Sequence, residues 1–273
     1  MDLLLLFKAA IMGLVEGITE FLPISSTGHL ILAGQLLDFW TIEKREMFAV
    51  AVQIGAIAAV IYEYWGKLWG ALIGGLKGQE QGRRLSLNLI IASIPIVIVG
   101  LTFGDIIKAY LFNAITVAIA LIVGGGIILW AERRPHSIKT QEVDDLTYKQ
   151  ATLIGLIQCL ALFPGTSRSG STIIGSLFLG VSRKAAAEFS FFLGIPVLMG
   201  AGLLDMYKMR ADLHSNDMAV LAVGIIVAFI SALIVIRALI RYVSKHDFTA
   251  FAYYRIGFGL FILVTWWTGW VSW

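Results

Sequence analysis

Long hydrophobic runs recur along this chain between short polar loops. They lie near residues 47–62, 87–103, 113–130, 188–206, 217–236 and 249–270, and charged residues or glycine-containing turns bound each of them. A helix needs about 20 predominantly apolar residues to cross a bilayer, and in lipid its backbone has to satisfy its own polar groups. The pattern therefore predicts an all-α polytopic membrane protein with about six transmembrane helices.

Two further apolar stretches, residues 3–37 and 151–181, are interrupted in the middle by Pro, Ser, Thr and Gly. Neither predicts one uninterrupted spanning helix, because an internal proline removes a backbone hydrogen bond and breaks or kinks the helix. Irregular backbone at membrane depth is tolerated only where protein or a water-filled cavity surrounds it. We therefore expect each stretch to form a re-entrant helical hairpin.

The two broken stretches share much of their sequence. Residues 13–26 read GLVEGITEFLPISS and residues 155–167 read GLIQCLALFPGTS, with Leu22 as the single unmatched residue. The register continues into the next hydrophobic run, where Phe48 corresponds to Phe189. This similarity predicts an internal repeat.

The repeat suggests how the chain is organised. We expect one membrane domain over residues 1–273, made of a first repeat over about 1–130 and a second over about 150–273, each a hairpin followed by three spans. An odd number of crossings per repeat turns the second copy upside down. Such inverted-topology repeats place a site near the midplane, where broken helices meet.

The composition excludes a soluble domain. The chain is 58% hydrophobic and only 14% charged, whereas soluble domains have about 25% charged residues. Its net charge is +3, but the basic residues are scattered and form no stripe, which excludes a nucleic-acid partner.

Lys and Arg concentrate in three loops, 63–86, 131–150 and 237–248, and are sparser in the loops between them. By the positive-inside rule these three loops are cytoplasmic. The N-terminus, residues 38–46 and the C-terminus are then expected on the outer side.

Two acidic residues stand out at membrane depth. Glu16 and Glu20 are four residues apart, so their carboxylates project from the same face of the predicted helix. They could pair with a buried cation merely for packing. Ionisable residues inside a membrane are nevertheless functional by default, and these two precede a helix break.

After Pro23 the chain reads ISSTGH, and a second helix is expected to begin near Gly28. A new helix N-terminus presents unpaired N–H groups and the positive end of the helix dipole, which together bind anions. The hydroxyls of this segment offer a nucleophile, and His29 offers a proton carrier.

The second break, residues 164–172, repeats this arrangement with more hydroxyls and adds Arg168. A guanidinium presents a planar fork that matches phosphate oxygens and stays protonated. We align Arg168 with Thr27, Leu162 with Glu20 and Gln158 with Glu16, so one copy carries acids and the other a cation. Brought together, the two breaks would suit phosphoryl transfer, in which positioning and charge neutralisation supply most of the catalysis.

At these residues the sequence closely resembles the undecaprenyl pyrophosphate phosphatases of the bacitracin-resistance (BacA/UppP) type. The resemblance rests on EGITE at 16–20, FLPISSTGH at 21–29 and PGTSRSGST at 164–172, and it extends over nearly the whole chain. It implies a multi-pass enzyme of the bacterial inner membrane. The loop charges place the mouth of the first broken stretch on the outer side, so we expect the site to open to the periplasm. The enzyme would convert undecaprenyl diphosphate to the monophosphate for peptidoglycan synthesis and confer resistance to bacitracin, which competes for the same lipid.

The resemblance also implies a divalent cation, Mg²⁺ or Ca²⁺. From the residues and the resemblance together we assign catalytic roles to Glu20, Ser26, His29 and Arg168, metal binding to Glu16 and Glu20, and phosphate binding to Ser25, Thr27, Gly28, Ser167, Ser169, Gly170 and Thr172.

Several points stay open from the sequence. Inverted repeats with broken helices are also transporter architecture, so a transporter or flippase of polyprenyl phosphate is the alternative function. The residues do not decide whether Ser26 or a water molecule attacks, which cation binds, or whether the protein forms a homodimer.

Overall fold

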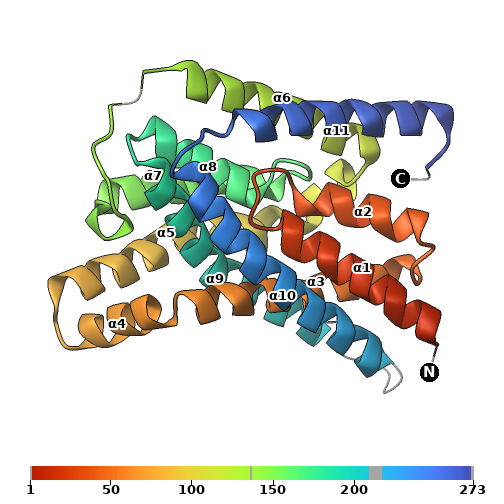
Figure 1. Cartoon of the computed structure of the whole chain (residues 1–273), viewed down its shortest axis with the longest axis horizontal. Helices are drawn as coiled ribbons and strands as arrows, with labels where there is room; N and C mark the ends of the chain where they lie inside the picture. The colour runs from red at the N-terminus through yellow and green to blue at the C-terminus, as the bar shows by residue number, and fades with distance from the viewer. Residues whose placement is uncertain (1, 136, 209–216, 272–273) are drawn as a thin grey trace.

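The computed structural model describes residues 2–135, 137–208 and 217–271, and over these residues it is helical with no strand. Figure 1 shows the helices running mostly along the long axis of the molecule. In chain order the helices are α1 (Leu3–Thr19), α2 (Ser26–Leu36), α3 (Ile42–Glu63), α4 (Trp65–Leu76), α5 (Glu80–Leu111), α6 (Ala114–Arg133), η1 (Val143–Asp145), α7 (Tyr148–Gln158), η2 (Cys159–Leu162), α8 (Arg168–Phe178), α9 (Arg183–Lys208), α10 (Met218–Val243) and α11 (Thr249–Thr268).

Six helices in the described part of the chain are long and apolar enough to cross a bilayer, which confirms the predicted number of spans. They cover Lys44–Glu63, Glu80–Ile107, Ala114–Arg133, Arg183–Tyr207, Met218–Val243 and Thr249–Thr268. The loop expected at 207–216 lies largely outside the described residues.

Helix α4 was not predicted. We expected residues 63–86 to form a polar loop, but Trp65–Leu76 is helical and packs against the start of α5. The close contact depends on small residues, since a Cβ at Gly82 would lie 2.8 Å from the carbonyl oxygen of Ala71. With 12 residues α4 is too short to span a bilayer. It contains four glycines, which disfavour a helix, so its sequence did not predict one.

The two broken stretches each form a pair of short helices, α1 with α2 and α7 with α8. In Figure 1, α1 and α2 lie side by side at the end that carries both termini, and α7 and α8 lie nearer the opposite end. Neither α2 nor α8, with 11 residues each, is long enough to cross a bilayer. The turns between the paired helices meet inside the molecule, where the side chain of Ser169 donates to the carbonyl of Leu22.

Each helix pair packs closely against a span from the other half of the chain. A Cβ at Gly13 of α1 would lie 2.4 Å from the carbonyl oxygen of Gly224 in α10, and one at Gly155 of α7 would lie 2.5 Å from that of Ala92 in α5. Small residues allow such close approach of helices within a membrane. The two halves therefore interlock instead of standing side by side.

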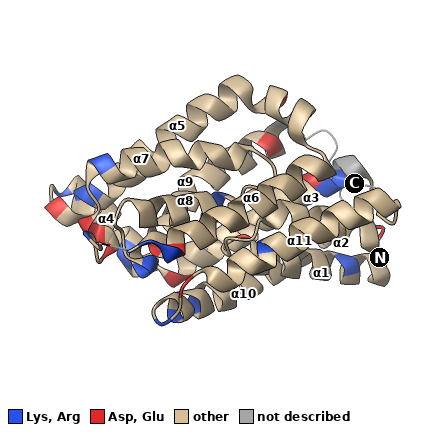
Figure 2. Ribbon diagram, turned by 90° about the horizontal axis from the view of Figure 1, so that it is seen from above, with Lys and Arg blue, Asp and Glu red and all other residues tan. Residues whose placement is uncertain are grey.

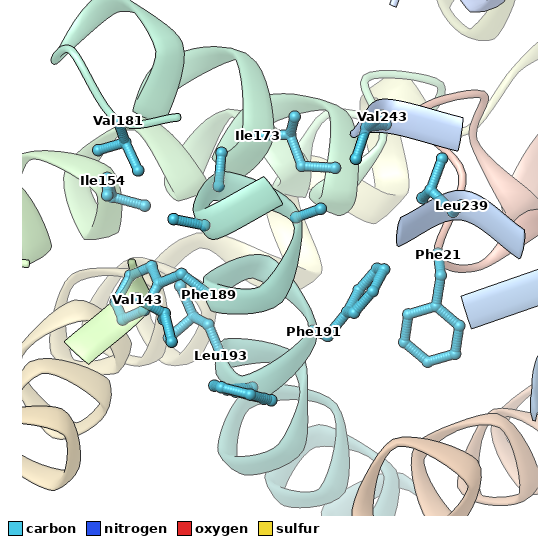
Figure 3. Packing of buried hydrophobic residues seen from close by; sticks show 14 of the residues in the cluster. Phe21, Val143, Ile154, Ile173, Val181, Phe189, Phe191, Leu193, Leu239 and Val243 are labelled. Atoms are coloured by element: carbon cyan, nitrogen blue, oxygen red, sulfur yellow. The ribbon is translucent and has the colours of Figure 1, made fainter. Parts of the chain in front are cut away.

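Below the breaks, aromatic side chains fill the core. Phe189 and Phe191 of α9 are fully buried, and Figure 3 shows Phe191 facing Phe21 from the first break. The rings of Phe21 and Phe191 meet edge to face, with 5.3 Å between centroids, a favourable aromatic geometry. This contact supports the first turn from beneath.

The basic loops gather at one end of the molecule, as the charge pattern predicts (Figure 2). Ion pairs join them, because Lys67 lies 3.1 Å from Asp144 and Arg237 lies 2.7 Å from Glu63. The opposite end has far fewer charges.

We predict that cysteines at Lys77 and Ser137 react from the cytoplasmic side and a cysteine at Trp270 from the outer side, because the positive-inside rule orients the basic end inward. All three positions are exposed. The measurement is labelling of intact cells with a membrane-impermeant maleimide, with Cys159 replaced by Ala as background. Opposite accessibility of the Lys77 and Ser137 positions would contradict the topology.

Candidate active site

The two acidic residues Glu16 and Glu20 lie where α1 ends. Glu16 is on the last turn, Glu20 follows the helix directly, and both are buried, with 1% and 7% of their surface exposed. Carboxylates so deep in an apolar environment need partners or a changed charge state. The structure therefore has to provide compensating groups at this point.

Both breaks end at a serine in an unusual backbone conformation. Ser25 has φ 71° and Ser167 has φ 72°, a region that favours glycine, and the helices α2 and α8 begin at the following residues, Ser26 and Arg168. Strained backbone of this kind costs on the order of 1–3 kcal/mol and clusters at functional sites.

This common geometry corrects our alignment of the two copies. Arg168 takes the first helical position of α8, so it is equivalent to Ser26 and not to Thr27, and Gly28 is equivalent to Gly170. The prediction aligned Pro23 with Pro164 and so needed an unmatched residue. Where each helix starts is decided by the conformation of the serine before it, not by the proline.

An ion pair joins the two breaks. Nη2 of Arg168 lies 2.9 Å from Oε1 of Glu20, and both side chains are buried. The hydroxyl of Ser26 donates to the other oxygen of Glu20, at 2.8 Å. Glu20 therefore connects the first residue of α2 with the first residue of α8.

Arg168 is held from behind by α9. Its Nη1 donates to the carbonyl of Ser190 at 2.7 Å. Gly194 leaves the room that the guanidinium occupies, since a Cβ there would lie 2.9 Å from Nη2. Nε of Arg168 is buried and has no hydrogen-bond partner among the described residues.

Three of the predicted phosphate-binding residues have structural contacts. Ser169 donates to the carbonyl of Leu22, and Thr172 donates to Oγ of Ser190 at 2.8 Å. Oγ of Ser167 accepts a hydrogen bond from the backbone N–H of Gly170 at 3.0 Å and thereby caps α8. Ser169 and Thr172 thus fasten the second break to its neighbours.

A cavity of about 170 Å³ lies between the breaks. Its polar walls include half of the predicted site residues and one residue that was not predicted, Gln53 of α3. The polar lining residues are Glu20, Ser25, Ser26, Thr27, Gln53, Ser167 and Arg168. The predicted residues Glu16, Gly28, His29, Ser169, Gly170 and Thr172 do not line it.

His29 is engaged elsewhere. Its Nδ1 lies 2.7 Å from the carbonyl oxygen of Ser25, which can only accept, so Nδ1 carries the proton. Its Nε2 lies 2.7 Å from the hydroxyl of Tyr254, and the ring stacks on Phe258. The structure therefore brings Glu20, and not His29, to the hydroxyl of Ser26.

The charges around the cavity favour an anion. Helices α2 and α8, of 11 residues each, both begin at residues of its wall, so two helix N-termini and their dipoles lie at the space. In α8 the N–H of Gly170 is already bonded to Oγ of Ser167. Arg168 adds a positive charge, with Glu20 as its ion-pair partner at the same wall. A phosphate group between the breaks would meet donors from both sides.

The predicted cation site can be tested on the donor atoms. Both carboxylate oxygens of Glu16 are buried and lack a hydrogen-bond partner among the described residues, and the second carboxylate, Glu20, is one turn away. No group of three acidic, His or Cys side chains gathers within the described part of the chain. Two carboxylates are too few ligands for a divalent cation, so the ligand's own oxygens would have to complete its coordination from the side of Glu20, the one of the two that lines the cavity.

Arg255 of α11 is the main site residue that our sequence reasoning missed. It is 1% exposed, and its hydrogen bonds within the described part of the chain go to carbonyl groups and not to a carboxylate. Its guanidinium donates to five backbone carbonyls, those of Pro23, Ala120, Leu121, Gly165 and Thr166, at 3.0–3.3 Å. Three of these belong to the breaks.

The signal for Arg255 was present in the sequence. An arginine inside the apolar run 249–270 is an ionisable residue at membrane depth, and such residues are functional by default. Ser190, by contrast, carries no signal of its own, because a serine hydroxyl in an apolar helix can bond to the preceding turn. Tyr254 carries none either, because tyrosine is common in membrane helices near the interface.

Comparisons with known proteins show the family of this chain. The family model described as bacitracin resistance protein BacA matches residues 9–261. Undecaprenyl-diphosphatase 1 of Acinetobacter baylyi is 64% identical over 274 residues, covering 100% of this chain and 100% of that protein. Undecaprenyl-diphosphatase 2 of Rhodospirillum rubrum is 59% identical, covering 100% and 99%. Undecaprenyl-diphosphatase of Nitrosomonas europaea is 58% identical, with the same coverage.

We predict that Arg255→Met lowers the free energy of unfolding by at least ~3 kcal/mol, because three carbonyls at the breaks lose their donor and each unpaired group costs about 1–3 kcal/mol. Thermal unfolding in detergent is the measurement. Arg237→Met is the matched control, since Arg237 forms an exposed ion pair with Glu63 and should cost at most ~1 kcal/mol. Equal shifts in the two variants would contradict the assigned role of Arg255.

Proposed function

The chain belongs to the family of the bacitracin resistance protein BacA, and we propose that it hydrolyses undecaprenyl diphosphate to undecaprenyl phosphate and inorganic phosphate. It is a multi-pass membrane enzyme. The observation that supports this reaction best is the convergence of two helix N-termini, Glu20, Ser26 and Arg168 on one cavity. The product is the carrier lipid used again in cell-wall synthesis.

The diphosphate would enter the cavity with its terminal phosphate between the two helix starts. Backbone N–H groups of α2 and α8 neutralise its negative charge, and Nε of Arg168, which has no partner among the described residues, is a further donor. Phe112, Phe163 and Leu198 line the apolar part of the cavity and suit the first isoprene units.

In the first step Ser26 attacks the terminal phosphorus while its proton passes to Glu20, whose Oε2 already accepts the hydroxyl hydrogen bond. The new Oγ–P bond forms as the bridging P–O bond breaks, and undecaprenyl phosphate leaves with the electron pair. Arg168 neutralises the charge that develops on this leaving group.

In the second step water hydrolyses the phosphoserine. Water attacks the phosphorus while one of its protons passes to the regenerated Glu20 carboxylate. The new O–P bond forms as the Oγ–P bond breaks, Glu20 returns that proton to Oγ of Ser26, and inorganic phosphate is released. The proton taken up in the first step has by then passed to the leaving phosphate, so the sum of the two steps consumes one water molecule.

We propose that Glu16 and Glu20 hold a divalent cation together with oxygens of the substrate. When bound, the cation supplies neutralisation of phosphate charge. The orphaned oxygens of Glu16 support this assignment. Glu20 is also the ion-pair partner of Arg168, so the cation and the guanidinium would share this carboxylate.

We also propose that the enzyme lies in the inner membrane, with its two halves related as inverted repeats and the site open to the periplasm. The equivalent positive-φ serines support the repeat. Phe112, which lines the cavity, follows α5 at the end opposite the basic loops, and this supports a periplasmic opening. Bacitracin would then compete for the lipid on that side.

The relatives named above favour hydrolysis over the transporter alternative, since each is named as a diphosphatase. The geometry of the site also favours hydrolysis over transport. A carboxylate at 2.8 Å from a serine hydroxyl is an arrangement for proton removal, which transport does not require.

Ser26→Ala should lower kcat for phosphate release by at least ~100-fold, because losing a positioned nucleophile costs at least that much. The assay is release of phosphate from undecaprenyl diphosphate by purified protein in detergent. Acid quenching with labelled substrate should trap phosphoserine in the wild type and not in the variant. Ser93→Ala, which removes a buried hydroxyl of α5 bonded to Leu89, should leave kcat unchanged. Near-normal turnover in Ser26→Ala would identify water as the attacking group.

Arg168→Lys should lower kcat by about 10²–10³ while KM changes little, because lysine keeps the charge without the planar fork that matches the transition state. Steady-state kinetics and thermal unfolding test this together. Arg183→Lys, which alters the ion pair with Glu132 beside the basic loops, is the control for a purely structural effect. Full activity in Arg168→Lys, or a stability loss that accounts for the missing activity, would remove Arg168 from the catalytic residues.

A further inference from the structure

Gln53 is a polar side chain in the middle of a spanning helix. It lies in α3, within the span Lys44–Glu63, and every other residue from 47 to 61 is apolar or glycine. An amide in such a run has to be compensated, since burying it without a hydrogen bond costs several kcal/mol in an apolar medium. The motifs at the two breaks do not include this residue.

The side chain of Gln53 has no hydrogen-bond partner among the described residues, and this distinguishes it from comparable amides. Asn88 of α5 donates to the carbonyl of Leu146 at 2.8 Å, and Gln158 of α7 donates to that of Ala92 at 3.3 Å. Those two amides hold helices together. Gln53 instead lines the cavity that contains Glu20, Ser26 and Arg168.

The repeat explains why the cavity has room for this side chain. The connection from α8 to α9 is one residue shorter than the connection from α2 to α3, so the starts of α3 and α9 match Ile42 with Arg183. In this register Gln53 of α3 corresponds to Gly194 of α9. In the second half, the helix after the break begins with the long Arg168, and the small Gly194 leaves room for its guanidinium. A Cβ at Gly194 would lie 2.9 Å from Nη2. In the first half the sizes are exchanged, because the break begins with the short Ser26 and the facing span carries the long glutamine.

The chemistry of an amide suits what the cavity lacks. Glu20 is an acceptor only, and both ends of the Arg168 fork are already used by Glu20 and Ser190. A glutamine amide offers two N–H donors without adding charge. A diphosphate carries several oxygens. Gln53 could donate to one of them from α3, a third element beside the two helix starts.

We propose that Gln53 is a substrate-contacting residue, whose amide N–H donates to a phosphate oxygen of the lipid diphosphate. This inference rests on the proposed function and extends its site to a third element, α3. The unpartnered amide is then kept for the ligand, at the expense of stability in the free protein.

The decisive variant is Gln53→Met, which keeps the length of the side chain and removes its donors. Kd for undecaprenyl diphosphate and KM for its hydrolysis should rise about 10-fold or more, as expected for losing a hydrogen bond to a charged group. Thermal stability should stay the same or increase, since no hydrogen bond within the protein is lost. Gln53→Glu, of the same shape but anionic, should weaken binding more than Gln53→Met.

Asn88→Leu is the matched control, because it removes a membrane-depth amide that does have a partner in the protein. It should lower thermal stability and leave Kd and KM unchanged. Wild-type Kd and KM in both Gln53 variants would overturn the inference, and so would a loss of stability without any change in binding. The proposed function has its own criterion: if the wild type releases no phosphate, hydrolysis is refuted, and the Kd comparison still decides the role of Gln53.

Discussion

The hydrogen bonds of Arg255 hold together the part of the molecule on which the site depends. A helix broken inside a membrane leaves carbonyl groups that lipid cannot satisfy, and this chain has two such breaks. One guanidinium donates to the carbonyl of Pro23 in the first break, to those of Gly165 and Thr166 in the second, and to two carbonyls of α6. Gly124 leaves space for it, since a Cβ there would lie 2.2 Å from Nη2. The breaks are therefore fixed relative to each other before any substrate binds.

That fixed relation makes a site which neither half contains alone. Glu20 and Ser26 come from the first break and Arg168 from the second, and they are joined by contacts of 2.8 and 2.9 Å. Buried ion pairs add little to stability, and the positive φ of Ser25 and Ser167 costs energy. Together with the unpartnered oxygens of Glu16, these features mark a region that sacrifices stability for chemistry. The tightly packed Phe21, Phe189 and Phe191 beneath it offset that loss.

The motif residues divide into two groups by what they touch. Ser26 and Arg168 face the cavity. Ser169, Thr172 and His29 are hydrogen bonded to neighbouring elements, and the ring of His29 is stacked on Phe258. A substitution in the second group acts on the reaction through the position of the first. Loss of activity alone would not tell the two groups apart, whereas kinetics and stability measured together would.

The sequence by itself determined the membrane environment, the six spans, the two breaks and most of the cavity's polar walls, because hydropathy and helix-breaking residues are local properties. It also placed Glu16 and Glu20 in one break and Arg168 in the other, whereas the structure decided that Glu20 is the ion-pair partner. Tertiary structure decided what depends on the meeting of distant elements: the equivalence of Arg168 with Ser26, the engagement of His29 by Tyr254, and the helix α4, which packs against α5 where Gly82 approaches the carbonyl of Ala71. The roles of Gln53 and Arg255 were also decided by tertiary structure. Each is one polar residue in an apolar run, and only the packed helices show that Gln53 lines a cavity and that Arg255 donates to five carbonyl groups.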